Sequence, residues 1–291
     1  MKLLCVHAHY DDYEFVAGGT FEMWRRKLGA ELRTKVVVCT DGCGGHQFRT
    51  RAETGRLRLE EQLASARVGG YEFELLRLPS GEILREAGFG ATTEVLAALW
   101  KTIRDFEPDY LFCPPIPRDP LVGVHVDHIA VAEAVRKVAY LINVPHAFTP
   151  EYPADETQST PCKVPVIINV HDGYMGGGER SDLAVEVGPA FELICAMSWC
   201  HQSQIREWLP WVGRHDLAAP ANLAEWAVAL RRRLEKNARG QGLKTNRLLE
   251  FFNVTAWGTV PTWEQIERDF PNLVPEMSNF ERLRERLDRL A

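Results

Sequence analysis

Short apolar runs rich in β-branched residues alternate with longer amphipathic stretches along this chain. The runs predict strands, at residues 2–7, 34–40, 72–78, 109–113 and 164–170. The stretches predict helices, at residues 18–28, 51–68, 92–105, 127–142, 188–200 and 222–238. Because alternating strands and helices are typical of a parallel sheet covered by helices, we expect an α/β fold. The expected architecture is a Rossmann-like three-layer α/β/α arrangement with a mostly parallel sheet.

Two short clusters of histidine and aspartate lie where predicted strands end and helices begin. The first, His9-Tyr10-Asp11-Asp12, follows the first strand, and the second, His125-Val126-Asp127-His128, opens the helix predicted from residue 127. In α/β proteins this edge of the sheet carries the chemistry. The helix repeats apolar residues that would pack on the sheet, so its first turn would present His128 to a cavity at this edge.

The residue types in these clusters suit a hydrolytic metal site. A divalent metal takes two or three imidazole or carboxylate ligands and keeps an open position for water, and His9, Asp12 and His128 supply such a set. Asp11, His125 and Asp127 are the types needed for a general base, an oxyanion donor and a carboxylate that orients a histidine. The alternative is that these residues cap helices and bond loops.

At these residues the sequence resembles the LmbE-like deacetylases, or PIG-L family, whose members remove acetyl groups from N-acetylglucosamine units. The family signature His-Pro-Asp-Asp-Glu, before a Gly-Gly-Thr helix entry, is similar to residues 9–13 and 18–20, and its His-x-Asp-His element is similar to residues 125–128. Segments 36–42, 108–112 and 201–204 look like two family strands and its His-x-Ser-Gln element. Tyr10 replaces the family's proline, and Tyr13, followed by Glu14, stands where the family often has glutamate.

The resemblance implies a metal-dependent hydrolase that releases acetate from an N-acetylglucosamine-type amino sugar conjugate. Its site residues would be Zn²⁺ ligands at His9, Asp12 and His128, a general base at Asp11, a protonated oxyanion donor at His125 and an orienting carboxylate at Asp127. Fe²⁺ suits the same ligand types. We expect substrate contacts at His46, Arg49, Arg51 and His201, and a structural role for His7.

The resemblance covers residues 1–205, which we expect to form the catalytic domain. Residues 206–291 would be a C-terminal helical extension packed on the same domain. Five tryptophans lie in this extension, at positions 208, 211, 226, 257 and 263. They suggest either an aromatic wall for sugar stacking or the core of a C-terminal cap, and we favour the core because buried aromatic area dominates packing.

Composition narrows the class of partner. The net charge of −6 argues against nonspecific binding to nucleic acid or anionic membranes, which favours a small-molecule amino-sugar conjugate as partner. Neither an apolar run long enough to span a bilayer nor a signal-peptide pattern is visible, so we expect a cytoplasmic protein. The seven cysteines form no Cys-x-x-Cys pair and are best explained as buried thiols. The sequence leaves the oligomeric state open, homo-oligomers included.

Two other functions remain open at this point. The same residues could serve a metal-dependent amidase that cleaves a larger amide on an amino sugar. A catalytically silent sugar-binding relative, its site closed by Tyr10 and Tyr13, is the second alternative. The retained Asp11 argues against silence, since binding alone requires no general base.

Overall fold

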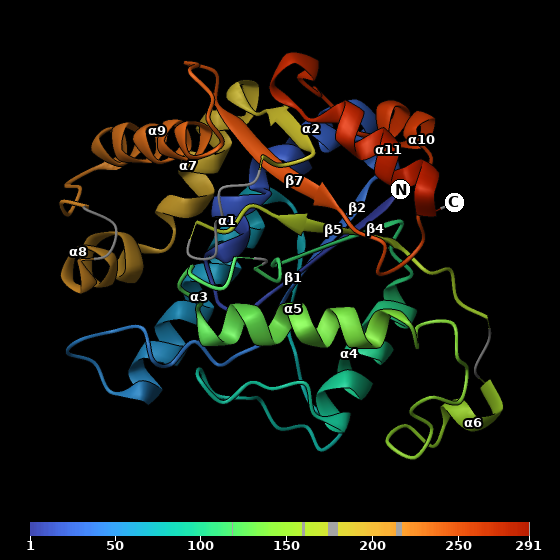
Figure 1. Cartoon of the computed structure of the whole chain (residues 1–291). Helices are drawn as coiled ribbons and strands as arrows, with labels where there is room; N and C mark the ends of the chain where they lie inside the picture. Colours follow the sequence, from blue (N-terminus) through green and yellow to red (C-terminus); the bar gives the residue numbers. More distant parts are fainter. Residues whose placement is uncertain (118, 159–160, 174–179, 214–216, 291) are drawn as a thin grey trace.

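The computed structural model describes residues 1–117, 119–158, 161–173, 180–213 and 217–290, and these contain one seven-stranded sheet (Figure 1). Its strands, in chain order, are β1 (Lys2–His7), β2 (Arg33–Val38), β3 (Glu72–Leu75), β4 (Tyr110–Cys113), β5 (Val166–Val170), β6 (Leu183–Glu186) and β7 (Leu249–Val254). They lie in the order β3-β2-β1-β4-β5-β7-β6. The first five strands pair in parallel, whereas β7 runs antiparallel to both β5 and β6.

The α/β prediction is confirmed, and all five predicted strands are present. The sequence missed β6 and β7, which are antiparallel neighbours at one side of the sheet. The segment that forms β7 lies in the predicted C-terminal extension, yet it enters the sheet between β5 and β6. The last third of the chain is therefore built into the central sheet in addition to packing on it.

The helices are α1 (Asp12–Val16), α2 (Gly18–Leu28), α3 (Arg51–Gly69), α4 (Thr93–Phe106), α5 (Val126–Ala139), α6 (Asp155–Gln158), α7 (Phe191–Trp199), α8 (Leu209–Val212), α9 (Leu223–Gly240), α10 (Trp263–Asp269) and α11 (Phe280–Leu290). A π-helical segment, η3 (Ser203–Trp208), leads into α8, and short 3₁₀ turns cover Gly29–Glu31, Gly188–Ala190 and Pro275–Met277. The six predicted helices appear as α2, α3, α4, α5, α7 and α9. Within the described residues, no helix has the length and apolarity that crossing a bilayer would require.

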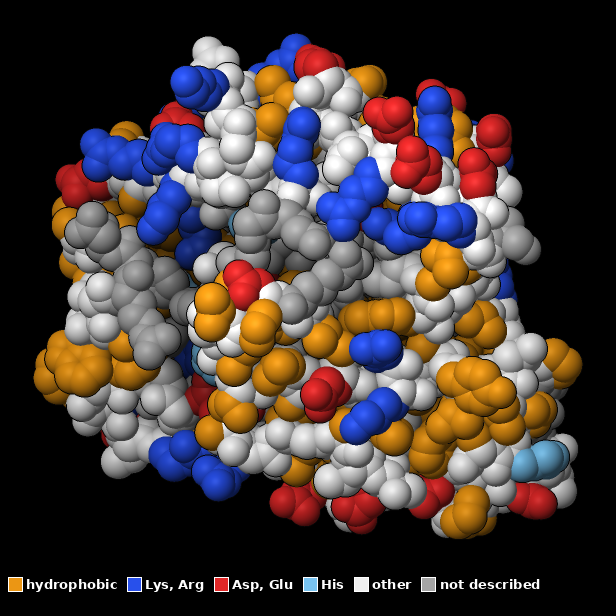
Figure 2. All heavy atoms as spheres, viewed as in Figure 1, with side chains coloured by type: hydrophobic (Ala, Val, Ile, Leu, Met, Phe, Trp, Pro, Cys, Tyr) orange, Lys and Arg blue, Asp and Glu red, His pale blue; other side chains and the backbone are white. Residues whose placement is uncertain are grey.

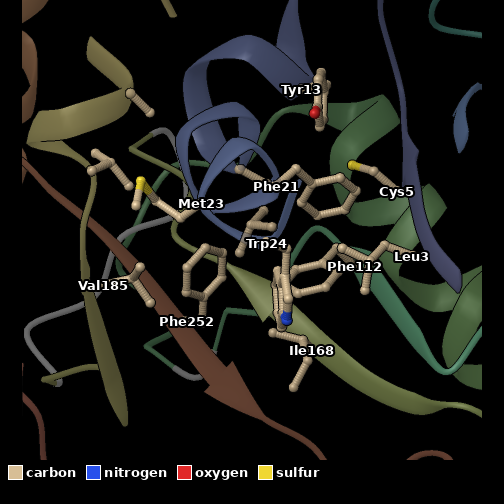
Figure 3. Packing of buried hydrophobic residues seen from close by; sticks show 14 of the residues in the cluster. Leu3, Cys5, Tyr13, Phe21, Met23, Trp24, Phe112, Ile168, Val185 and Phe252 are labelled. Atoms are coloured by element: carbon tan, nitrogen blue, oxygen red, sulfur yellow. The ribbon is translucent and has the colours of Figure 1, made fainter. Parts of the chain in front are cut away.

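Two large hydrophobic cores lie between the three layers, and a smaller cluster packs around β6 and β7. Alternate residues of β1 face opposite ways, because side chains along a strand point to opposite faces. Leu4 and Val6 join the core under α4 and α5, whereas Leu3 and Cys5 join the core under α1, α2, α7, α10 and α11. The core that contains Leu3 and Cys5 gathers aromatic rings around Trp24, whose ring centroid lies 5.8 Å from that of Phe112 (Figure 3).

The strand order fixes where a site can form. After β1 the chain builds β2 and β3 on one side of it, and then returns to place β4 on the other side. Such a reversal leaves a crevice at the carboxyl ends of the two central strands, β1 and β4. The first His/Asp cluster follows β1 directly, and the second opens α5 after β4. Both clusters therefore meet at one edge of the sheet.

Candidate metal centre

The turn after β1 brings the first cluster into a cavity. Asp11, the N-cap of α1, has a φ of 81°, a left-handed conformation that aspartate tolerates better than bulkier residues. Asp12 begins the helix, and its Oδ2 accepts a hydrogen bond of 2.8 Å from the backbone amide of His9. His9, Asp11 and Asp12 thereby all line one cavity.

Three donor atoms in this cavity form a nearly equilateral triangle. His9 Nδ1 lies 3.2 Å from His128 Nε2 and 3.4 Å from Asp12 Oδ2, and His128 Nε2 lies 3.5 Å from Asp12 Oδ2. Zinc bonds of ~2.0–2.1 Å in tetrahedral geometry place neighbouring ligand atoms ~3.4 Å apart. The residues therefore fit a zinc ion. His7 and His125 lie close by, in two further sets of candidate ligands, His7 with Asp12 and His128, and His9 with His125 and His128.

The hydrogen bonds around the triangle select the tautomers that a metal requires. His9 donates from Nε2 to Asp127 at 3.0 Å, and His128 donates from Nδ1 to Asp172 at 2.5 Å. A neutral imidazole that donates from one nitrogen keeps a lone pair on the other. The lone pairs of both histidines thus belong to the two atoms of the triangle. Carboxylates that orient histidine ligands in this way are a regular feature of metal sites.

The charges of the cluster also favour a cation at its centre. Burial opposes ionisation of Asp12, but His7 and His128 hold the pKa of its carboxyl well below the usual range. His7 Nδ1 bonds Asp12 Oδ2 at 2.6 Å, which gives His7 an orienting role. Burial also opposes protonation of His9, yet hydrogen bonds with Asp12 and Asp127 raise the pKa of His9 to about 10. A proton on His9 thus supplies positive charge where the three ligand atoms meet, and a metal bound there would replace that proton and take up the Nδ1 lone pair.

Asp11 lies in the same cavity, held by helix α3. Arg58 donates to its Oδ1 at 3.2 Å, and the backbone amide of Asp11 donates to Gln62 at 3.0 Å. Burial raises the pKa of the Asp11 carboxyl to about 6, while the positive charge of Arg58 opposes the rise. A carboxylate with such a pKa is ionised at neutral pH and basic enough to accept a proton.

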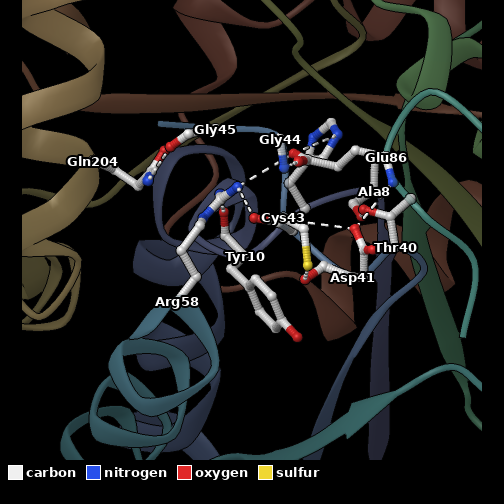
Figure 4. Close-up of polar contacts among 12 residues, drawn as sticks. Ala8, Tyr10, Thr40, Asp41, Cys43, Gly44, Gly45, Arg58, Glu86 and Gln204 are labelled. Atoms are coloured by element: carbon white, nitrogen blue, oxygen red, sulfur yellow. Dashed lines mark hydrogen bonds and ion pairs between the residues drawn. The ribbon is translucent and has the colours of Figure 1, made fainter. Parts of the chain in front are cut away.

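Arg58 also explains how the loop accommodates tyrosine at position 10. Its guanidinium donates to the carbonyl oxygens of Tyr10 and Gly42 and to the Glu86 carboxylate, at 2.8, 3.2 and 3.3 Å (Figure 4). It also lies over the Tyr10 ring, 5.6 Å from the centroid. Gly42, at φ 62°, lies against the same ring and leaves no room for a Cβ. These contacts hold the loop where the family has a rigid proline.

His125 and Asp127 are arranged differently from the expectation. His125 is the N-cap of α5, and its Nδ1 accepts from the Asp127 amide at 3.3 Å. Burial and the neighbouring His9 and His128 lower the pKa of His125 to about 4, so its imidazole is neutral. The Asp127 carboxylate bonds His9 and the Ala87 amide. The expectation of a protonated His125 held by Asp127 is therefore corrected, because burial among other histidines disfavours its charge.

The four expected substrate contacts do not line the cavity. His46 is a partly buried residue whose side chain is shielded from solvent, and its Nε2 lies 2.6 Å from Glu207. Arg49 also pairs with Glu207, and Arg51 pairs with Asp41 at 3.1 Å. The fourth, His201, is fully buried, and its Nε2 lies 3.2 Å from Glu14. The polar groups of these four side chains instead form ion pairs and hydrogen bonds that hold loops and helices together.

Glu14 is buried and directly follows Tyr13, the second position at which this sequence departs from the family pattern. Besides its contact with His201, it accepts hydrogen bonds from Gln62 and Tyr71, at 3.1 and 2.8 Å. Tyr13 packs among aromatic rings, 5.2 Å from Phe21 between centroids. Glu14 thus ties α1 to α3 through Gln62, the residue that also holds the Asp11 amide, and it does not line the cavity.

Several cavity residues escaped the sequence prediction. Asp172 follows β5 and lies at the same edge of the sheet as the two clusters, which is the signal that could have found it. Within the described residues, the others that line the cavity are Phe15, Val16, Gly45, Arg58, Glu86, Gly173, Gln204, Trp208, Leu209 and Arg233. Of the His-x-Ser-Gln element, it is Gln204 and not His201 that reaches the cavity. Most of these residues come from segments without a recognisable motif.

Fold and site together define an α/β protein with a centre of two histidines and one aspartate that can hold a metal. Residues 4–139 match the model of the family described as PIG-L: GlcNAc-PI de-N-acetylase. The resemblance inferred from the motifs is therefore confirmed over this part of the chain. No curated protein matches the sequence.

Solved structures show the same fold at low sequence identity. N,N'-diacetylchitobiose deacetylase from Pyrococcus horikoshii matches with a TM-score of 0.65 and 21% identity, over 88% of this chain and 84% of the other. The conserved protein TT1542 from Thermus thermophilus matches with a TM-score of 0.61 and 18% identity, over 90% and 97%. GalB, the 4-carboxy-2-hydroxymuconate hydratase from Pseudomonas putida, matches with a TM-score of 0.56 and 16% identity, over 87% and 95%.

Proposed function

We propose that the protein is a metal-dependent hydrolase that removes the N-acetyl group from an N-acetylglucosamine-type amino sugar conjugate and releases acetate. The observation that carries this proposal is the triangle of His9, Asp12 and His128, with sides of 3.2 to 3.5 Å, in one cavity with Asp11. The match to the GlcNAc-PI de-N-acetylase family supports an amino sugar as substrate. So does the fold shared with a diacetylchitobiose deacetylase.

His9, Asp12 and His128 would hold the metal, which we propose to be Zn²⁺. Fe²⁺ suits the same ligand set and is the alternative. A metal bound there would supply an acidified water and polarise the acetamide carbonyl. Asp127 and Asp172 would keep the two imidazoles in the ligand tautomers, through the hydrogen bonds described above.

Asp11 would act as the general base and then as the general acid. Its raised pKa of about 6 suits a carboxylate that takes a proton from water and returns it to the leaving nitrogen. Arg58 would limit that rise in pKa and fix the carboxylate in place, since it donates to Oδ1. The leaving amine would depart protonated, as the free amino sugar.

His125 would stabilise the developing oxyanion in its neutral form. Because its Nδ1 accepts from the Asp127 amide, its proton belongs to Nε2, which can donate a hydrogen bond into the cavity that His125 lines. Asp127 would contribute through His9 rather than through His125. This assignment replaces the charged imidazole expected from the sequence.

The proposal is tested by incubating metal-loaded protein with a panel of N-acetylglucosamine derivatives and measuring acetate and free amine. We expect release by the wild type and loss of release in Asp11→Ala. Asp105→Ala is the matched control, because Asp105 is an exposed carboxylate on α4, paired with Lys101. Release only from derivatives with longer acyl groups would instead favour the amidase. Ligand binding without any release would favour the silent sugar-binding relative. Cytoplasmic location, the oligomeric state and the domain boundary at residue 205 stay predictions of the sequence.

A further inference from the structure

Glu14 and His201 form a buried pair to which the proposed mechanism gives no role. Glu14 is 1% exposed and His201 is fully buried, and His201 Nε2 lies 3.2 Å from Glu14 Oε1. Charged side chains ordinarily stay in water, and Figure 2 shows Lys, Arg, Asp and Glu side chains spread over one face of the molecule. Taking two charges out of water costs free energy that their attraction need not repay, so stability alone does not explain this pair.

Several hydrogen bonds converge on one oxygen of Glu14. Its Oε1 accepts from Gln62 Nε2 at 3.1 Å and from the Tyr71 hydroxyl at 2.8 Å, and it also accepts from the Ser65 hydroxyl. Burial opposes a positive charge on His201, but the Glu14 carboxylate raises the pKa of its imidazole. Among the described residues, Glu14 is the hydrogen-bond partner of this imidazole, whose Nδ1 is buried without one. His201 therefore serves Glu14 as a donor and a counter-charge.

The Glu14 carboxylate decides which way round the Gln62 amide lies. An ionised carboxylate only accepts hydrogen bonds, so the NH₂ group of Gln62 must face it. The amide oxygen then points the other way, where it accepts from the backbone amide of Asp11 at 3.0 Å. Gln62 is 1% exposed, so its amide is shielded from water that could otherwise turn it. Glu14 on α1 thus acts on the Asp11 backbone through a side chain of α3.

This hydrogen bond holds Asp11 in an unusual backbone conformation. An N-cap aspartate ordinarily has extended backbone and turns its carboxylate onto the first amides of its helix. Asp11 is the N-cap of α1 but lies at φ 81°, and its side chain makes no capping bond. Its carboxylate lines the cavity instead, where it accepts from Arg58. Because a left-handed residue other than glycine costs free energy, a relaxed turn with the carboxylate on the helix amides competes with this one.

We propose that three buried residues, Gln62, Glu14 and His201, position the general base. Gln62 holds the backbone amide of Asp11, which keeps the left-handed turn that presents the Asp11 carboxylate to the cavity. Glu14 fixes the Gln62 amide, and His201 orients and balances Glu14. None of the three lines the cavity, so they act through Asp11 and not on the substrate. The inference rests on the proposed deacetylase function, in which Asp11 is the base.

Acetate release by zinc-loaded protein tests these contacts. Gln62→Met removes both hydrogen bonds of the amide at similar size, and it should lower kcat about tenfold while KM and zinc affinity stay near wild type. Gln62→Glu should also lower kcat, because its carboxylate would face that of Glu14 without a donor between them. The exchange Glu14→Gln/Gln62→Glu again places one amide beside one carboxylate and keeps an acceptor for the Asp11 amide. It should recover most of the wild-type kcat.

Ser278→Ala is the matched control, because it also removes a buried side-chain acceptor from a backbone amide. That amide belongs to Ala184 in β6, at the far edge of the sheet from the metal centre. The control should lower Tm and keep the wild-type kcat. Should Gln62→Met fail to fold, Tyr71→Phe is the milder form of the test, since it removes one donor to Glu14 and one acceptor for the Gln62 amide. It should lower kcat with KM unchanged.

Crystal structures of metal-free wild type and Gln62→Met give a second result that requires no activity. In the variant, the φ of Asp11 should become negative and its carboxylate should move onto the amides of α1. A wild-type kcat in Gln62→Met, with Asp11 unmoved, would refute the positioning inference and leave the deacetylase function standing. If the wild type releases no acetate, the deacetylase function is wrong, and the position of Asp11 in the two crystal structures still decides whether Gln62 holds the turn.

Discussion

The orientation of His128 by Asp172 offers a quantitative test of the metal centre. Both side chains are buried, and His128 Nδ1 donates to Asp172 Oδ2 at 2.5 Å. This bond leaves Nε2, the atom of the ligand triangle, with its lone pair. Asp172→Asn keeps an oxygen acceptor but loses the negative charge, whereas Asp172→Ala loses both.

The expected effect is a graded loss of zinc affinity. Removing such orienting partners weakens metal binding about 10- to 100-fold, or ~1.4 to 2.7 kcal/mol. Because Asn retains the acceptor, we expect about 10-fold weaker binding for Asp172→Asn and about 100-fold for Asp172→Ala. Zinc affinity is measured by competition with a chromophoric chelator at one fixed pH.

Two comparisons make this result decisive. Asp109→Asn is the control, since Asp109 precedes β4 at the opposite edge of the sheet and pairs with Lys163. It should bind zinc as the wild type does. His128→Ala should lose tight binding altogether. If His128→Ala loses zinc but Asp172→Ala binds it normally, the orienting role of Asp172 is wrong. If both bind it normally, the ligand set itself is wrong.

Three further predictions concern the base, the cavity wall and the loop. Asp11→Asn should lower kcat for acetate release by about 10²- to 10⁴-fold. Its zinc affinity in chelator competition should stay nearly unchanged, and a kcat near wild type would refute the role of Asp11 as base. Trp208→Ala should raise KM for amino sugars with little change in Tm, because Trp208 lines the cavity. By contrast, Trp226→Ala should lower the free energy of unfolding by ~3–5 kcal/mol, because Trp226 is buried and bonds Ser198. Gly42→Ala should destabilise the fold by ~1–3 kcal/mol in denaturant unfolding, since its Cβ would overlap the Tyr10 ring at a positive φ. Gly90→Ala, with open space around its Cβ, should cost less, and equal losses would contradict this account.

Where no motif is present, the sequence did not predict which tryptophans lie in the core and which line the cavity. The sequence offered a sugar-binding wall or a core for all five together, and the structure divides them. Trp226 is buried in the core, whereas Trp208 lines the cavity and stacks on the exposed Trp211, with ring centroids 5.4 Å apart. Helical spacing alone does not separate these positions, because η3 is π-helical and shifts the faces of the segment relative to a regular α-helix.

The local pattern of residues along the chain was enough to predict most of the strands and helices and the residue types in the site. Hydrophobic periodicity reflects contacts between near neighbours, so it located five strands and six helices. The two clusters carry their residue types at fixed spacing after a strand and at the start of a helix. Position at the carboxyl ends of β1 and β4 was therefore predictable for His9, Asp12 and His128.

Only the tertiary structure decided the partners of these residues. Asp172 reaches His128 across 44 positions of the sequence, and Arg58 reaches Asp11 across 47. The carboxylate of Asp127 bonds His9 rather than its near neighbour His125, and β7 enters the sheet from the last third of the chain. Such contacts depend on strand order and on how helices pack across the sheet, which a local pattern does not encode. The sequence by itself indicated the three candidate metal ligands and their neighbours in the two clusters, and the packing determined their tautomers, their partners and the rest of the cavity lining.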